Sequence, residues 1–214
     1  MGQVICYERV NRRENKKEVS IETFFENPRE IFSLWGEPSV SVDAVFRLLK
    51  EQTEKQYRND LKREYLPAVS LDQVKIMSID IDGLEDSPEA KQSIIGQLKN
   101  DESIYCLQES ASGNLVIFYK FDCSTEDYQY LYYKKYLELT LRLEIEIDYL
   151  PEINRLRYVS LGEKYIYNKD AKPLTELLKV NRMLTPKKEV KEKEPAKAFE
   201  LLTKAATTSK VFKS

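Results

Sequence analysis

The sequence contains no histidine among its 214 residues. This absence excludes Ser-His-Asp and Cys-His hydrolases, zinc sites with histidine ligands, and every mechanism that uses an imidazole as general base. Any catalysis by this chain must therefore rest on carboxylate, lysine, arginine, tyrosine or hydroxyl groups.

Cysteines and long apolar runs are also scarce. The three cysteines, Cys6, Cys106 and Cys123, include no CxxC pair, so we expect neither a zinc site nor a disulfide framework. No run of about 18 apolar residues occurs, and the first residues lack the charged-then-apolar pattern of an export signal. We therefore expect a cytoplasmic protein with no membrane partner.

Charge is nearly balanced over the whole chain but uneven along it. The 34 basic and 36 acidic residues give a net charge of -2. Residues 186–214 contain 8 Lys and 4 Glu, a local charge of +4 that leaves -6 on residues 1–185. We interpret 186–214 as a solvated linker or tail, in which 196–206 could form a short helix with Phe199 and Leu202 on one side.

Ahead of this tail we expect a strand and helix extension over 1–70, followed by a core over 71–185. Within the extension, apolar residues at roughly helical spacing predict one helix over 41–65, which Pro67 terminates. Its apolar side carries Val45, Leu48, Leu49, Leu61 and Tyr65. Its other side is either a solvated face or a phosphate-contacting face. The basic residues on that side are Lys50, Lys55, Arg58, Lys62 and Arg63.

The core alternates between strand and helix patterns. Ser87 and Pro88 mark one helix start, and Ser124 with Asp127 forms a capping box at another. The predicted order is strand, helix, strand, strand, helix, strand, which is the ferredoxin-like βαββαβ order. We therefore predict an α+β fold with an RRM-like sheet and helices on one of its faces. The predicted elements are strands over 74–82, 103–109, 115–121, 143–148 and 155–160, and helices over 87–99 and 124–141.

An acidic pair ends the first core strand. In Ile79-Asp80-Ile81-Asp82, the two-residue period of a strand places both aspartates on one face, roughly 6–7 Å apart. Such a pair suits Mg²⁺ or Mn²⁺ and the phosphates that accompany these ions. Because Asp is depleted in strands, the pair favours a site. The alternative is the polar face of an edge strand in water.

The predicted strand over 143–148 repeats the pattern. Its apolar residues alternate with Glu144, Glu146 and Asp148. By itself this pattern is typical of a half-buried strand with one wet face. In the βαββαβ order the last strand lies antiparallel beside the first, so a favourable register would make Asp148 a third ligand.

Two further segments could contact phosphate. The turn over 110–114 (SASGN) could present backbone N–H groups and hydroxyls, or it could be an ordinary hairpin turn. Arg155 and Arg157 share one face of a predicted strand, where they could bind phosphate bidentately or pair with the neighbouring Glu side chains.

Several of these segments together resemble the VirE N-terminal domain family. The segments that carry the resemblance are LKREYLPAVS at 61–70, SIDIDGL at 78–84, ESASGNLVIFYKF at 109–121, IEID at 145–148 and NRLRYVSLGEKYIYN at 154–168. Domains of this family stand at the front of replication proteins of mobile elements and phages, often ahead of a helicase or primase module. They look distantly related to archaeo-eukaryotic-type primases, whose core is an RRM-like sheet. The resemblance covers roughly residues 18–178.

This resemblance implies roles for individual residues. Asp80 and Asp82 match the metal-binding aspartate pair of those primases, and Asp148 matches their third carboxylate. Arg155 matches an arginine that follows this carboxylate in the family.

The resemblance also shows a departure. Ser112 and Gly113 match the small-residue turn before the second primase motif. That motif ordinarily supplies a His, or in some relatives a Lys, that holds the phosphates of the incoming nucleotide. This chain has the apolar residues Leu115 and Val116 there, so the resemblance implies the metal site without the phosphate-holding side chain of that motif.

Three hypotheses about function follow. The first is a primase-like nucleotidyltransferase in which Asp80, Asp82 and Asp148 hold Mg²⁺ or Mn²⁺, and Arg155 or Arg157 steadies the phosphates of a nucleoside triphosphate. The second is an inactive module that binds single-stranded DNA or RNA, or a replication partner such as a helicase. The third is a structural or interaction protein.

Overall fold

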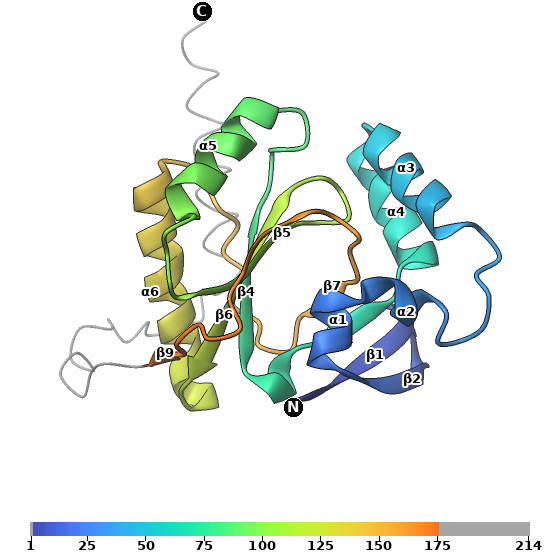
Figure 1. The fold of residues 1–214 in the computed structure, drawn as a ribbon, viewed down its shortest axis with the longest axis horizontal. Coiled ribbons are helices and arrows are strands. Elements are labelled where there is room, and N and C mark those ends of the chain that lie inside the picture. Colours follow the sequence, from blue (N-terminus) through green and yellow to red (C-terminus); the bar gives the residue numbers. More distant parts are fainter. Residues whose placement is uncertain (1, 176–214) are drawn as a thin grey trace, which may run out of the picture. The chain divides into compact units, whose positions relative to one another are not determined.

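The computed structural model describes residues 2–175. These residues form an α+β fold with six α-helices and two mainly antiparallel sheets (Figure 1), so the predicted class is confirmed. None of the described helices is long and apolar enough to cross a membrane. The predicted tail at 186–214, its candidate helix at 196–206 and the last residues of the predicted core lie outside the described residues.

The first sheet is built mainly from the N-terminal extension. Its strand order is β2-β1-β3-β7, and all neighbouring pairs are antiparallel. The strands are β1 (Gln3–Arg9), β2 (Arg12–Ser20), β3 (Ala68–Ser70) and β7 (Leu156–Tyr158). The helices between β2 and β3 are α1 (Ile21–Glu26), α2 (Pro28–Phe32), α3 (Val42–Glu51) and α4 (Lys55–Tyr65).

The prediction of a single helix over 41–65 is wrong, because α3 and α4 are separate. Gln52 ends α3 with an extended backbone, and its side-chain oxygen accepts a hydrogen bond from the Glu54 backbone N–H at 2.9 Å. A side chain that bonds a nearby backbone N–H competes with the helical hydrogen bond. The buried face also differs from the predicted one: Phe46 and Leu49 are buried, whereas Leu48 is 47% exposed.

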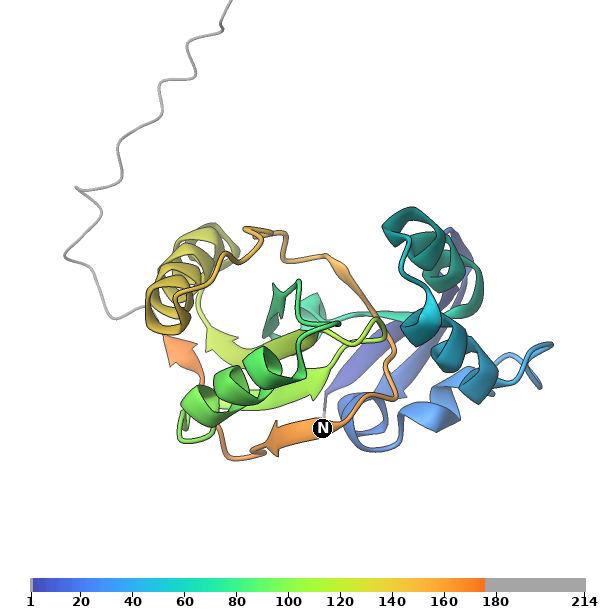
Figure 2. The same ribbon diagram turned by 90° about the horizontal axis from the view of Figure 1, so that it is seen from above.

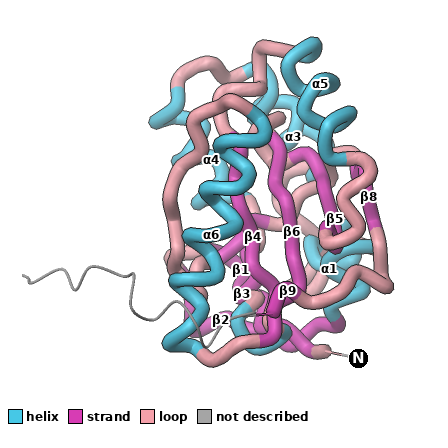
Figure 3. The backbone as a smooth tube through the Cα atoms, turned by 90° about the vertical axis from the view of Figure 1, so that its left-hand side faces the viewer, coloured by secondary structure: helices cyan, strands magenta, loops and turns pink. Residues whose placement is uncertain are grey.

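The second sheet has the strand order β4-β6-β5-β8, and α5 and α6 cover one of its faces (Figures 2 and 3). Met77, Ile79, Ile117 and Tyr119 point into this layer and are fully buried. The strand and helix assignments between 76 and 141 are confirmed, including the Ser124 cap, which accepts a hydrogen bond from the Asp127 backbone N–H. The elements are β4 (Ile76–Ile81), α5 (Pro88–Leu98), β5 (Ile104–Glu109), β6 (Leu115–Asp122), α6 (Thr125–Leu143) and β8 (Lys164–Tyr167), with the short β9 (Leu174–Thr175) beside β6 and a 3-10 turn (Asp72–Val74) before β4.

The predicted strand over 143–148 does not form. Helix α6 continues to Leu143, and Glu144 then takes a left-handed backbone conformation with φ 55°. The alternation in burial is nevertheless real: Ile147 is 2% exposed, whereas Glu146 and Asp148 are exposed. Alternating burial requires only an extended chain that crosses an apolar surface, so the pattern alone does not establish strand pairing.

The last predicted strand is also placed differently. Residues 156–158 form β7, but β7 pairs with β3 of the first sheet rather than with the core sheet. The outer neighbour of β5 is instead β8. The residue pattern of 156–158 does not indicate which of the two sheets this strand joins, because each sheet has a strand edge with which it could pair.

The second sheet has another face, away from α5 and α6, and this face positions the site. Paired residues of neighbouring strands point to the same side, so Asp80, Val116 and Gln108 form one row across β4, β6 and β5. Phe118 lies in the next row and is covered by Phe25 of α1, with ring centroids 5.0 Å apart. The N-terminal extension therefore packs on one part of this face and leaves the Asp80 row beside a cavity.

Candidate functional site

A cavity of about 480 Å³ adjoins this face of the second sheet. Its walls come from β4, the turn between β5 and β6, helix α4 and the segment 148–160. The sequence-predicted residues that line it are Lys55, Arg58, Lys62, Asp80, Asp82, Ser112, Asp148, Arg155 and Arg157. Lys50, Arg63 and Gly113 are not part of the lining. The structure thus brings together candidates from four separate segments of the sequence.

Asp80 is held by arginines. The Arg157 guanidinium donates a hydrogen bond to the Asp80 carboxylate and another, at 3.1 Å, to the Ser78 carbonyl oxygen. Arg155 Nη2 lies 3.7 Å from the same carboxylate. The sequence predicts that the arginine pair binds phosphate or pairs with neighbouring Glu side chains; in the structure both arginines lie beside a carboxylate, but it is that of Asp80 rather than of a glutamate. Arg157 is 8% exposed, and its Nε finds no hydrogen-bond partner among residues 2–175.

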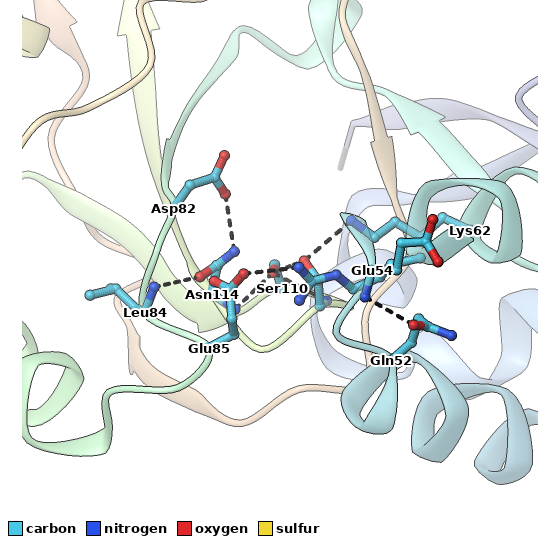
Figure 4. A network of polar contacts seen from close by, with 10 residues as sticks. Gln52, Glu54, Lys62, Asp82, Leu84, Glu85, Ser110 and Asn114 are labelled. Carbon is cyan, nitrogen blue, oxygen red and sulfur yellow. Dashed lines mark hydrogen bonds and ion pairs between the residues drawn. The ribbon is translucent and has the colours of Figure 1, made fainter. Parts of the chain in front are cut away.

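Asp82 has a different environment. It accepts a hydrogen bond from the Asn114 side-chain amide at 3.2 Å, while the oxygen of that amide accepts one from the Leu84 backbone N–H at 2.8 Å (Figure 4). Asp82 is open to solvent at its outer edge, but the cavity walls still remove enough water to raise its pKa. The neighbouring carboxylates Asp80 and Asp148 raise the pKa further, while Lys55 and Lys62 act in the opposite direction.

The SASGN segment is a hairpin turn that also forms part of the cavity wall. Ser110 donates its backbone N–H to the Asn114 carbonyl at 2.7 Å, and Gly113 has φ +88°, a left-handed conformation that favours glycine. The Ser112 hydroxyl accepts a hydrogen bond from Lys62 Nζ at 3.2 Å. The turn prediction is confirmed, and Ser112 is the residue of this segment that meets a basic side chain.

The basic residues of α3 and α4 do not form a single solvated face. Arg58 is turned inward, where it pairs with Glu85 at 3.0 Å and its side chain is 11% exposed. Burial, together with the nearby Arg58 charge, lowers the pKa of Lys62. Lys50 and Arg63 are more than half exposed and pair with Glu109 and Asp60, respectively.

The charged groups of the cavity wall therefore fall into two classes. Asp80, Glu85, Arg58, Arg155 and Arg157 are in ion pairs with one another. Within residues 2–175, the remaining charged groups have no salt-bridge partner within 4.0 Å. These groups are Lys55, Lys62, Asp82 and Asp148. Two cations and two carboxylates are thus left available to a ligand.

A preformed metal cage is absent from the part of the chain that the structure describes. No group of three or more Cys, Asp or Glu side chains there is arranged to hold a metal ion. Asp80, Asp82 and Asp148 line the same cavity, but Asp80 is already paired with Arg157. Mg²⁺ is commonly bound by one or two carboxylates together with ligand phosphates, and Asp82 and Asp148 fit that donor set.

Sequence reasoning missed several residues of the wall. Asn114 orients Asp82, Glu85 balances Arg58, and Gln108 lies in the Asp80 row. Gln108 could be found from the sequence, because it is a polar residue within β5. Once the hairpin register is known, its position lies on the same face of the sheet as Asp80. The roles of Asn114 and Glu85 depend on contacts with residues about 30 positions away, as for Asn114 and Asp82 with a separation of 32.

Comparisons with known proteins give no further guide to the site. No protein-family model, no curated protein and no solved structure matches this chain.

Proposed function

We propose that this chain is a primase-like domain of a replication protein and that its cavity binds a nucleoside triphosphate together with Mg²⁺ or Mn²⁺. The observation that carries the proposal is the pairing pattern of the wall, in which Lys55, Lys62, Asp82 and Asp148 lack ion-pair partners among the described residues. The two lysines would neutralise phosphate oxygens. The two carboxylates would face the metal ion that those phosphates bring.

In this proposal the metal ion binds together with the phosphates of the nucleotide. Mg²⁺ dehydrates reluctantly and usually keeps several waters while bound by one or two carboxylates and substrate phosphates. Asp82 and Asp148 would supply these carboxylates, and the ion would stabilise the charge of the phosphates.

The fold supports a primase-like assignment in outline. The order β4-β6-β5, with α5 after β4 and α6 after β6, agrees with the first five elements of a βαββαβ sheet. We propose that the domain is an RRM-like variant whose fourth strand is replaced by the extended segment after α6. The likeness to the VirE N-terminal domain family remains part of this proposal.

Calorimetric titration of ATP, with and without Mg²⁺ or Mn²⁺, tests the proposal. Lys62→Ala should weaken binding by about ten- to a hundredfold, because a hydrogen bond to a charged group contributes roughly 1.5–3 kcal/mol. Lys99→Ala is the matched control, since Lys99 is exposed and outside the cavity lining. Equal affinity of wild type and Lys62→Ala, or no nucleotide binding with either metal, would contradict the proposal.

The carboxylates have their own test. Asp82→Asn should remove most of the gain in ATP affinity that Mg²⁺ provides, because the amide oxygen is a weaker ligand than a carboxylate. Asp86→Asn, at an exposed aspartate outside the lining, should leave this gain unchanged. Metal-dependent affinity that survives in Asp82→Asn would place the ion elsewhere.

Nucleotidyl transfer is a second candidate function, favoured by the gathering of Asp80, Asp82 and Asp148 in one cavity with Arg155 and Arg157. Turnover would require the Asp80–Arg157 pair to open when the metal binds. A primer-synthesis assay with Mg²⁺ and Mn²⁺, against the Asp80→Ala/Asp82→Ala variant, decides between transfer and binding alone.

Binding of single-stranded DNA or RNA without turnover is the other candidate. The exposed Lys50 and Arg63 favour it, because they add positive charge on α3 and α4 beyond the cavity lining. Such binding should weaken steeply with salt, since phosphate contacts release counterions. A helicase or other replication protein is the protein partner that would accompany this role.

A further inference from the structure

Gln108 is a buried polar residue that the charged site does not use. It lies on β5, is 6% exposed and lines the cavity. The register of the sheet places it in one row with Val116 and Asp80, on the same face. Two strand spacings, about 10 Å in all, separate the Gln108 backbone from that of Asp80.

The hydrogen bonds of Gln108 are largely unfilled. Its side-chain oxygen receives one contact, from Cys106 Sγ at 3.9 Å, and a thiol is a weak donor. Its amide nitrogen donates to no residue that the structure describes. Turning the amide over would put the NH₂ group against the sulfur and leave the oxygen free instead, so one polar end stays available in both orientations.

The other buried uncharged polar side chains of the wall have hydrogen-bond partners, whereas the charged Arg157 and Glu85 each keep one buried atom without a partner among the described residues. Asn114 bonds Asp82 and the Leu84 backbone. The Ser160 hydroxyl donates to the Glu109 carbonyl at 2.9 Å and accepts from the Gly162 backbone N–H at 3.0 Å. The Gln108 amide thus lines the cavity with hydrogen-bonding capacity that no described residue fills, and a ligand that supplies a matching donor and acceptor gains affinity.

The sheet register pairs Gln108 with Lys164 of β8, but Lys164 is not part of the cavity lining, and its Nζ donates a hydrogen bond to the Phe25 carbonyl oxygen at 2.5 Å. The uncharged residues that line the cavity together with Gln108 include Ala111, Val116, Leu156, Tyr158 and Ser160. We call the part of the wall with Lys55, Lys62, Asp80 and Asp82 the charged end of the cavity and the part at Gln108 its amide end. The cavity volume of about 480 Å³ lies in the range of small-molecule sites.

We propose that Gln108 contacts the nucleobase of the bound nucleotide, whose phosphates lie at the charged end. This proposal rests on the phosphate site proposed above and names the ligand class more closely: a mononucleotide recognised through its base, rather than any polyphosphate. An amide has a donor and an acceptor side by side, and the edges of the nucleobases present complementary pairs. The sugar would lie over Val116, between the two ends.

The test compares ATP with inorganic tripolyphosphate, both with Mg²⁺, in wild type and Gln108→Leu. Wild type should bind ATP at least about fivefold more tightly than tripolyphosphate, because one good bidentate amide–base contact is worth about five- to a hundredfold in affinity. Gln108→Leu should lose this preference by weakening ATP binding while leaving tripolyphosphate binding unchanged. Lys62→Ala should weaken the binding of both ligands by the same factor.

Two controls keep the result interpretable. Gln92→Leu, at an exposed glutamine of α5, should bind both ligands as wild type does. Gln108→Leu should unfold at the wild-type temperature or above, since leucine of similar size removes a poorly satisfied amide. If Gln108→Leu fails to fold, Gln108→Met serves in its place.

The outcomes separate the two proposals. Equal ATP-to-tripolyphosphate ratios in wild type and Gln108→Leu would overturn the role of Gln108 and leave the phosphate site standing. Tighter binding of tripolyphosphate than of ATP by wild type would do the same. Failure of wild type to bind either ligand would overturn both proposals.

Discussion

Replacing Arg157 with methionine should destabilise the folded chain by about 3 kcal/mol. Arg157 is 8% exposed and donates to both the Asp80 carboxylate and the Ser78 carbonyl. Methionine keeps much of the apolar stem but leaves Asp80 with Arg155 alone, at 3.7 Å. Removing one partner of a buried ion pair typically costs about 3–5 kcal/mol, because the remaining charge stays desolvated.

The lower end of that range applies here. The side chain of Asp80 is 15% exposed, so water compensates it in part once Arg157 is gone. For a domain of 150–250 residues, 1 kcal/mol shifts the Tm by about 2–4 °C, so the expected decrease is about 6–12 °C. Arg155→Met is the matched control. It should cost less than about 1 kcal/mol, because its partner is distant and its side chain is 35% exposed.

Urea unfolding followed by circular dichroism measures these free energies without the ionic screening of guanidinium. The double variant Asp80→Asn/Arg157→Met should be less destabilised than the sum of the two single variants, because it removes both charges together. A loss below 1 kcal/mol for Arg157→Met, or strict additivity in the cycle, would refute the reasoning. Asp80 would then be free to bind a ligand rather than committed to the fold.

Two other predictions concern the packing and the acidic wall. Phe25→Ala should cost about 3–5 kcal/mol in urea unfolding, because Phe25 is fully buried against Tyr105 and Phe118, where α1 meets the second sheet; a cost below 1 kcal/mol would contradict that packing. Asp82→Asn should stabilise the ligand-free chain at pH 7. The pKa of Asp82 is higher in the folded chain than in the unfolded chain, where it is 3.8, so the folded chain loses stability as the pH rises from 3.8 through the folded-state pKa. The variant has no carboxylate there and does not lose this stability. The difference between Asp82→Asn and wild type should vanish below pH 3.8 in a pH series of thermal unfolding, and a difference that persists there would show another cause.

Local signals predicted most of the second sheet. The hairpin over 103–121 has two apolar strands around SASGN, and the glycine that the turn needs stands at the left-handed position, Gly113. Helix α6 begins at the Ser124 cap, whose partner Asp127 lies three residues away. Such contacts are short in sequence, so residue type and spacing suffice to identify them.

Burial without pairing misled the prediction at 143–148. The alternation of apolar and acidic residues correctly identified Ile147 as buried and Asp148 as exposed. A strand also needs a neighbouring strand with which it can form hydrogen bonds. In the structure the residues that find such a neighbour are 156–158, which pair with β3, and 164–167, which pair with β5. Asp148 therefore reaches the cavity from a segment without regular secondary structure rather than from the predicted strand.

The sequence by itself determined the chemistry that this chain can offer: no imidazole, two carboxylates two residues apart at the end of one strand, and two arginines two residues apart at the start of another. Within the strands, at Asp80 and Arg157, the side-chain directions follow from the two-residue strand period, which is a property of the local backbone. Only the tertiary structure decided which of these groups form ion pairs. Arg157, which is 77 residues from Asp80 in sequence, neutralises that carboxylate and leaves Asp82 and Asp148 without an ion pair among the described residues. Charge pairing depends on distances of a few ångströms between segments far apart in the chain, and these distances are set by how the sheets and helices pack rather than by spacing in the sequence.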